Sequence, residues 1–140
     1  ALKNISGLIT FSNYDTLFIN NKIIFLKDYI LDLLKDNKYV EITGSIDNRL
    51  PNHLSFILMN KDFFPIKAYK IINFMSDNNI SISSGSSCSS SKNSPSKVLT
   101  KLRVENNKLF SNIRLSFGEQ NSIDQIDKFY SLLLQCIDKF

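Results

Sequence analysis

The sequence contains few of the residues that build disulfide frameworks and metal centres. Its 140 residues include two cysteines, Cys88 and Cys136, and one histidine, His53. Two cysteines do not make a disulfide scaffold, so we expect both thiols to be free. Because no second His or Cys stands at ligand spacing from His53, this residue is interpreted as a hydrogen-bonded structural histidine rather than a metal ligand.

Long apolar runs are also absent. The longest uninterrupted runs have four residues, for example at 23–26 and 56–59, whereas a helix needs about 20 apolar residues to span a bilayer. Residues 1–10 lack the basic cluster, apolar stretch and small-residue cleavage site of a signal peptide. We therefore expect a protein without membrane contact, located in the cytoplasm.

Arginine is scarce. Of the 17 basic residues 14 are Lys and three are Arg, against 13 acidic residues, for a net charge of +4. The lysines are spread along the chain without a run of three, so this charge does not predict a nucleic-acid surface. Arg49, Arg103 and Arg114 are each candidates for a task that needs a planar fork of donors.

The hydrophobic pattern changes between helical and strand periodicity along the chain. The expected elements are a helix at 15–36, strands at 39–42 and 54–59, a helix at 65–76, a strand at 80–83, a short helix opened by Pro95, a strand at 112–117 and a helix from Ser122 to the end. This order predicts an α/β (α+β-like) fold, in which a small mixed or antiparallel sheet of about four strands packs against helices. No linker divides the chain.

Local signals set several of the expected helix ends. Pro65 is expected in the first turn of its helix, where a missing N–H costs nothing, and Ser94 is expected to cap the short helix. Ser122 and Gln125 have the spacing of a capping box. Cys136 falls on the apolar side of the last helix, so we expect it in the core.

The segment 83–94 has an unusual composition, with eight serines, one Gly and one Cys among its twelve residues. A thiol at Cys88, neither packed nor paired, suits a nucleophile on a mobile loop. The alternative is a flexible serine linker that happens to contain one cysteine. Lys92 is the nearest cation, and no histidine stands nearby in the sequence to act as a base.

Arg114 lies on the predicted strand 112–117, on the face opposite to Ile113 and Leu115. A guanidinium on such a rigid support could clamp a carboxylate with two parallel hydrogen bonds. The alternative is an arginine on the solvent face of a half-exposed strand.

Several motifs, taken in order, resemble the C-terminal region of one enzyme family. Residues 49–56 read R-L-P-N-H-L-S-F, and residues 83–90 read S-S-G-S-S-C-S-S. They are followed by P-S-K-V-L at 95–99 and N-I-R-L-S-F-G at 112–118. In this combination the chain resembles the cysteine desulfurases of the aminotransferase class V family, in the group whose active-site loop reads S-S-G-S-A-C-T-S.

The resemblance implies an enzyme dependent on pyridoxal 5'-phosphate that removes sulfur from L-cysteine and leaves L-alanine. Cys88 matches the loop cysteine that carries the sulfur as a persulfide, and Arg114 matches the arginine that binds the substrate carboxylate. A homodimer is implied, as is a sulfur-acceptor protein such as an iron–sulfur scaffold or a tRNA-thiolation protein. Ser87, Ser89 and Arg103 stand where Ala, Thr and often Gly are usual in the family.

The family binds its cofactor on a large domain, and no segment here matches the motif of the cofactor lysine. Residues 1–140 are therefore interpreted as the small C-terminal domain of a fold-type-I pyridoxal-phosphate enzyme, inactive alone and without cofactor-binding residues. Two alternatives stay open. The chain could be a stand-alone sulfur-relay or interaction module, or a degenerate paralogue that serves as a scaffold.

Overall fold

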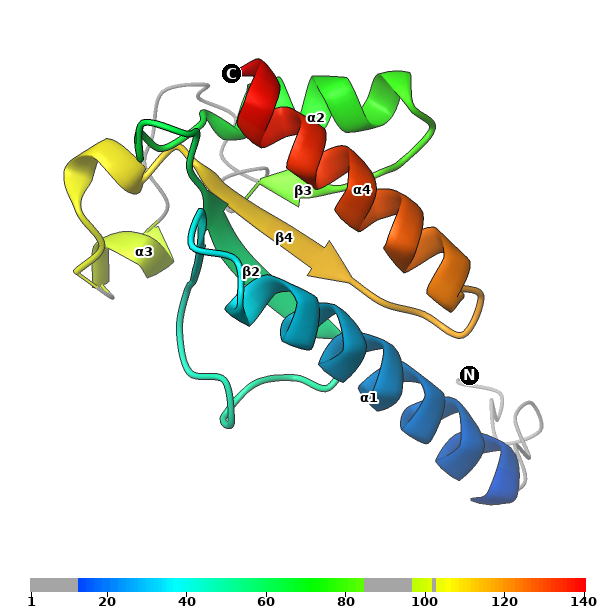
Figure 1. The fold of residues 1–140 in the computed structure, drawn as a ribbon. Helices are drawn as coiled ribbons and strands as arrows, with labels where there is room; N and C mark the ends of the chain where they lie inside the picture. The colour runs from blue at the N-terminus through cyan, green and yellow to red at the C-terminus, as the bar shows by residue number, and fades with distance from the viewer. Residues whose placement is uncertain (1–12, 85–96, 102) are drawn as a thin grey trace, which may run out of the picture.

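The computed structural model describes residues 13–84, 97–101 and 103–140. Within these residues the elements, in chain order, are α1 (Asn13–Lys35), β1 (Val40–Ile42), β2 (His53–Leu58), α2 (Ala68–Asp77), β3 (Ser83–Ser84), α3 (Lys97–Lys101), the 3₁₀ helix η1 (Asn106–Lys108), β4 (Asn112–Ser116) and α4 (Ile123–Lys139) (Figure 1). Apart from η1, this is the predicted order of helices and strands.

The strands form one four-stranded sheet in the order β1-β2-β4-β3, and every neighbouring pair is antiparallel. The structure thus confirms the antiparallel form of the predicted fold. Leu54 of β2 pairs with Leu115 of β4, and the next pair is Ser55 with Arg114. Because side chains alternate across a sheet, these two pairs lie on opposite faces.

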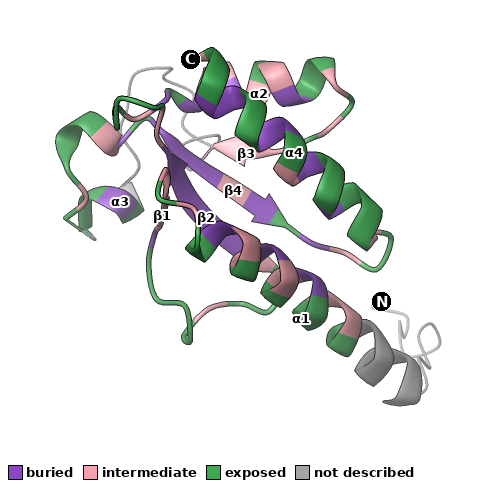
Figure 2. Ribbon diagram, in the orientation of Figure 1, coloured by how far each residue is buried: buried purple, intermediate pink, exposed green. Residues whose placement is uncertain are grey.

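Helices α1, α2 and α4 cover the apolar face of the sheet (Figures 1 and 2). The sheet contributes Leu54, Phe56 and Ile113 to this core, all without exposed surface. Each helix adds a stripe of buried side chains, such as Ile30 of α1 and Met75 of α2. Burial of these side chains is the main stabilising contribution to the fold.

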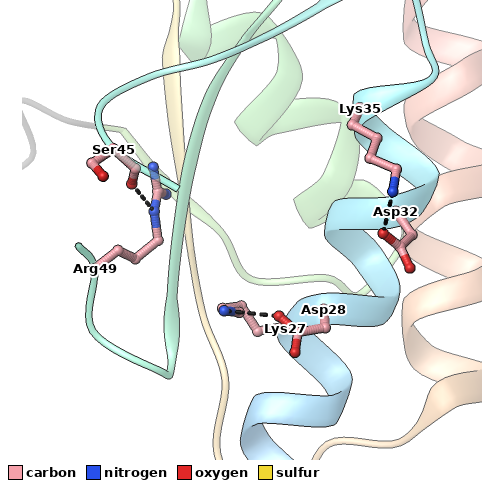
Figure 3. Close-up of polar contacts among 6 residues, drawn as sticks. All are labelled: Lys27, Asp28, Asp32, Lys35, Ser45 and Arg49. Atoms are coloured by element: carbon pink, nitrogen blue, oxygen red, sulfur yellow. Dashed lines mark hydrogen bonds and ion pairs between the residues drawn. The ribbon is translucent and has the colours of Figure 1, made fainter. Parts of the chain in front are cut away.

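Charged residues of α1 pair outside the core. Lys27 lies 2.8 Å from Asp28, and Lys35 lies 2.7 Å from Asp32 (Figure 3). The carboxylates of both pairs are more than half exposed, so each pair contributes little to stability. No helix among the described residues combines the length and the apolar character needed to cross a membrane.

The last helix begins as the sequence predicts. Ser122 is the N-cap of α4, and both halves of its capping box with Gln125 are formed. Cys136 is fully buried on the inner side of this helix and its thiol is free, which confirms its predicted place in the core.

The prediction that Pro65 opens a helix is wrong. Pro65 instead forms an isolated antiparallel bridge with Met59, and the Ile66 N–H donates to the Leu58 carbonyl at 2.8 Å. These contacts extend the pairing at the end of β2, so the backbone stays extended until Lys67, the N-cap of α2.

The predicted strand 80–83 is also misplaced. The Asn79 N–H donates to the Ser76 carbonyl, and the Ile80 N–H donates to the Met75 carbonyl at 2.9 Å, so both residues form the helix stop that follows α2. Of the predicted strand only its last residue pairs with the sheet, in β3 (Ser83–Ser84), which reaches the end of this described segment. The predicted cap Ser94 and the helix opening at Pro95 lie outside the described residues.

Candidate functional site

The second face of the sheet is polar and borders a hollow of about 300 Å³. The hollow lies between this face, helix α3 and the connection from β1 to β2. Leu99 and Val98 of α3 supply apolar wall, whereas the sheet supplies His53, Ser55 and Arg114. The alternation of side chains along β2 and β4 thus places polar groups here and apolar ones in the core.

A chain of buried hydrogen bonds forms the floor of the hollow. The Thr43 hydroxyl donates to Ser55 Oγ at 2.7 Å, and Ser55 Oγ donates to Asn112 Oδ1 at 2.8 Å. Ser55 belongs to β2 and Asn112 to β4, whereas Thr43 directly follows β1. Their mutual bonds satisfy buried polar groups and link three parts of the sheet.

Arg114 lies at the centre of the polar face. Its backbone pairs with Ser55 on one side and Ser83 on the other, and its Nη2 lies 3.5 Å from Ser83 Oγ. Within the described part of the chain, this long contact is the one hydrogen bond of the Arg114 guanidinium. The predicted strand face of Arg114 is confirmed, because the residue lines the hollow on the polar side and lies on a strand paired along both edges.

Arg49 lies in the connection between β1 and β2, and its side chain points toward Ser45 of the same connection (Figure 3). Its Nε donates to the Ser45 carbonyl at 2.9 Å, and its Nη2 donates to the Thr43 carbonyl at 2.6 Å. Its Nη1 is buried and has no hydrogen-bond partner among the described residues. Burial lowers the pKa of this guanidinium, but an arginine stays charged.

The sequence marked Arg49 only as one of three scarce arginines and as part of R-L-P-N. Its position in the hollow was missed, because an irregular connection has no periodicity from which side-chain direction can be predicted. The third arginine, Arg103, does not line the hollow; it follows α3 and is exposed.

His53 is the first residue of β2 and pairs with Ser116. Its pKa is lowered by loss of hydration on burial, then by the charge of Arg49, and then by that of Arg114. His53 therefore lies within electrostatic reach of both guanidiniums, and the neutral imidazole is favoured. Within the described part of the chain, no group of three or more His, Cys, Asp or Glu residues is placed to hold a metal ion.

Cys88 lies outside the described residues, as do Ser87 and Ser89. The described chain before them ends at Ser84, which pairs with Ile113 next to Arg114. In the sequence, three residues separate Ser84 from Cys88.

None of the described lysines lines the hollow. Pyridoxal phosphate is held in its enzymes through a Schiff base with a lysine, and the described lining of this hollow holds no such residue.

Comparisons with known proteins agree with the motifs. The family model for aminotransferase class V matches residues 6–129. The chain is 32% identical over 114 residues to a protein named cysteine desulfurase IscS of Vibrio cholerae serotype O1 (strain ATCC 39541), a match that covers 81% of this chain and 26% of the relative. It is 33% identical over 120 residues to the cysteine desulfurase IscS of Ruthia magnifica, covering 86% of this chain and 28% of the relative.

A solved structure is similar as well. The NifS-like protein from Rickettsia africae ESF-5 superposes with a TM-score of 0.71 at 26% identity, over 86% of this chain and 29% of that one. The chain thus spans between 26% and 29% of the lengths of these relatives.

Proposed function

The chain belongs to the aminotransferase class V family, and from this membership we propose that it is the small C-terminal domain of a cysteine desulfurase. The whole protein would take sulfur from L-cysteine and leave L-alanine. The observation that carries the proposal is the position of Arg114 of the I-R-x-S motif, at the centre of a polar sheet face that borders a hollow.

Arg114 is proposed to bind the carboxylate of the substrate. A bidentate clamp needs a guanidinium that is held rigidly and retains free donors. Arg114 is held between β2 and β3 through its backbone, and the described residues offer its side chain only the long contact to Ser83. No carboxylate among the described residues lines the hollow to compete for it.

Cys88 is proposed to accept the sulfur. Its thiolate would attack the sulfur of L-cysteine, so that an S–S bond forms while the C–S bond of the substrate breaks. The electron pair of that bond stays with the carbon fragment, which takes up a proton and leaves as L-alanine. Cys136 is unsuited to this role, because it is fully buried and burial raises its pKa to about 11.

The cofactor of this reaction is proposed to be pyridoxal 5'-phosphate, bound by a large domain outside residues 1–140. The persulfide would then pass to an acceptor protein, such as an iron–sulfur scaffold or a tRNA-thiolation protein. The homodimer stays a prediction from the family resemblance, and the cytoplasmic location stays a prediction from the sequence.

The proposal is tested with the whole protein, supplied with pyridoxal phosphate, L-cysteine and a reductant. We expect formation of alanine and sulfide, and mass spectrometry should find a persulfide on Cys88 and none on Cys136. Cys88→Ser should abolish turnover, and Cys136→Ala is the matched cysteine control that retains it. Full turnover in Cys88→Ser would refute the assignment of the nucleophile.

A second experiment tests the clamp. Arg114→Gln should raise the KM for L-cysteine, because the carboxylate loses its charged partner, while Arg103→Gln removes an arginine outside the hollow and should leave KM unchanged. Equal KM values for the Arg114 variant and the wild type would contradict the proposed role.

A further inference from the structure

The guanidinium of Arg49 is held in one orientation with one of its nitrogens unused. Two of its nitrogens donate to the carbonyls of Ser45 and Thr43, so the whole planar group is fixed. The third nitrogen, Nη1, is buried without a partner among the described residues. A buried unpaired donor is costly and rare, and this one belongs to a residue that lines the hollow.

The charge of the hollow is unbalanced. Among the described residues its lining contains the guanidiniums of Arg49 and Arg114 and the imidazole of His53, but no Asp or Glu. The lowered pKa of His53 has both arginines among its causes. A substrate carboxylate bound to Arg114, as proposed above, would balance the charge of that guanidinium and leave the charge of Arg49 unbalanced.

We propose that Arg49 is a second anion-binding residue of this hollow and that its ligand is an oxyanion group. This inference rests on the role proposed for Arg114. The oxyanion could be a second acidic group of an amino acid whose first carboxylate lies on Arg114, or a free inorganic oxyanion bound beside it. In both cases the ligand neutralises the remaining charge, and one of its oxygens pairs with Nη1 after a movement that opens this buried nitrogen to the hollow.

The first arm of the test uses L-aspartate and L-asparagine, which have nearly the same shape but differ in one negative charge. Each is added as an inhibitor of alanine formation by the whole, cofactor-loaded protein. We expect wild type to bind aspartate about tenfold or more tightly than asparagine, the size of one charge-assisted contact. Arg49→Gln should abolish this preference, Arg49→Lys should keep part of it, and the control Arg103→Gln should keep all of it.

The second arm uses sulfate as the free oxyanion. If the anion is inorganic, sulfate inhibits or activates wild type and Arg103→Gln, while Arg49→Gln loses about tenfold or more in affinity for sulfate and the aspartate preference is missing. If either the aspartate preference or the sulfate affinity depends on Arg49, the subsite is supported. The arm in which the dependence is found shows whether the oxyanion belongs to an amino acid or is inorganic.

The inference is wrong if neither aspartate preference nor sulfate affinity changes in the Arg49 variants. It is also wrong if Arg49→Gln only weakens binding of pyridoxal phosphate. Should Arg49→Gln fail to fold, Arg49→Lys carries the test, because it keeps the charge but loses the fork of donors. If wild type makes no alanine, the proposed function fails separately, and the NMR shift of the His53 imidazole on addition of aspartate or sulfate still measures the subsite.

Discussion

Arg103 has a backbone conformation that suits glycine. Its φ is +57°, and it stands just after the end of α3, where its N–H donates to the Thr100 carbonyl and the Val104 N–H donates to the Leu99 carbonyl. This is the hydrogen-bond pattern of a helix stop that places one residue in the left-handed region. The glycine often found there in the family has a physical reason, since a Cβ is unfavourable in this conformation.

We therefore expect Arg103→Gly to stabilise the protein by up to about 1 kcal/mol. The matched control is Lys101→Gly at the C-terminal end of α3, where glycine should be destabilising by up to about 0.5 kcal/mol. Thermal unfolding of the whole protein and hydrogen exchange of the Val104 amide measure both effects. Destabilisation by Arg103→Gly would contradict this account of the helix stop.

His53 should make stability dependent on pH. Burial, Arg49 and Arg114 lower its pKa below the ordinary value of 6.5, so below that pH the unfolded chain binds a proton that the folded chain does not. The contribution of His53 is therefore fully present above pH 6.5 and is lost as the pH falls through the lower pKa of the folded state. Between pH 5 and 8, the melting temperature of the wild type should fall more steeply with decreasing pH than that of His53→Gln.

NMR titration of the His53 imidazole provides an independent check. Arg49→Gln should raise the pKa of His53, because one repelling charge is removed. An unchanged titration curve would mean that Arg49 does not act on this histidine.

The two arginines of the hollow show what a sequence reveals about single residues. Arg114 could be placed, because strict alternation with Ile113 and Leu115 fixes the face of a strand. Arg49 could not, because its position depends on hydrogen bonds to the carbonyls of Thr43 and Ser45 in an irregular connection. Three-dimensional contacts of this kind leave no periodic pattern.

At the scale of elements, α4 depends on its capping box. Ser122 Oγ accepts from the Gln125 N–H at 3.4 Å, and the Gln125 side chain accepts from the Ser122 N–H at 3.3 Å. These bonds satisfy donors that the first turn of a helix leaves unpaired.

Ser122→Ala is expected to cost about 1 kcal/mol of stability. Ser131→Ala, on the exposed side within the same helix, is the matched control and should be neutral or slightly stabilising, because alanine is the better helix former. Denaturant midpoints of the two variants in the whole protein provide the comparison. Equal effects of both substitutions would show that the cap contributes nothing.

Helices were easier to predict than strand ends, for a physical reason. The period of α4 and its cap are local, and both were predicted from residues close in sequence. The pairing of Pro65 with Met59, and that of Ser83–Ser84 with β4, depends on partner residues outside each segment. Such pairing is decided by contacts between distant segments, and a strand pattern alone does not contain it.

At the scale of the whole molecule, Cys136 reports on the integrity of the core. Its thiol has no exposed surface, and burial raises its pKa to about 11. The thiolate that reacts with alkylating agents is therefore both rare and shielded in the folded protein.

We expect Cys136 to stay unmodified by iodoacetamide in the native protein at pH 8 and to react once denaturant opens the core. Peptide mass spectrometry locates the modified cysteine. Met75→Ala, which removes a fully buried side chain of the same core, should destabilise the protein by about 2 to 5 kcal/mol and expose Cys136 at lower denaturant concentration. Rapid native labelling would contradict the packing of α4 against the sheet.

The register of β4 links the stability of the molecule to the assembly of its site. A slip of one residue would turn Arg114 into the helix-covered core and Ile113 and Leu115 out of it, and an unpaired buried guanidinium costs several kcal/mol. A misregistered chain would therefore be unstable as well as inactive. Cellular proteases that degrade unfolded chains would thus also remove the molecules in which Arg114 faces the wrong way.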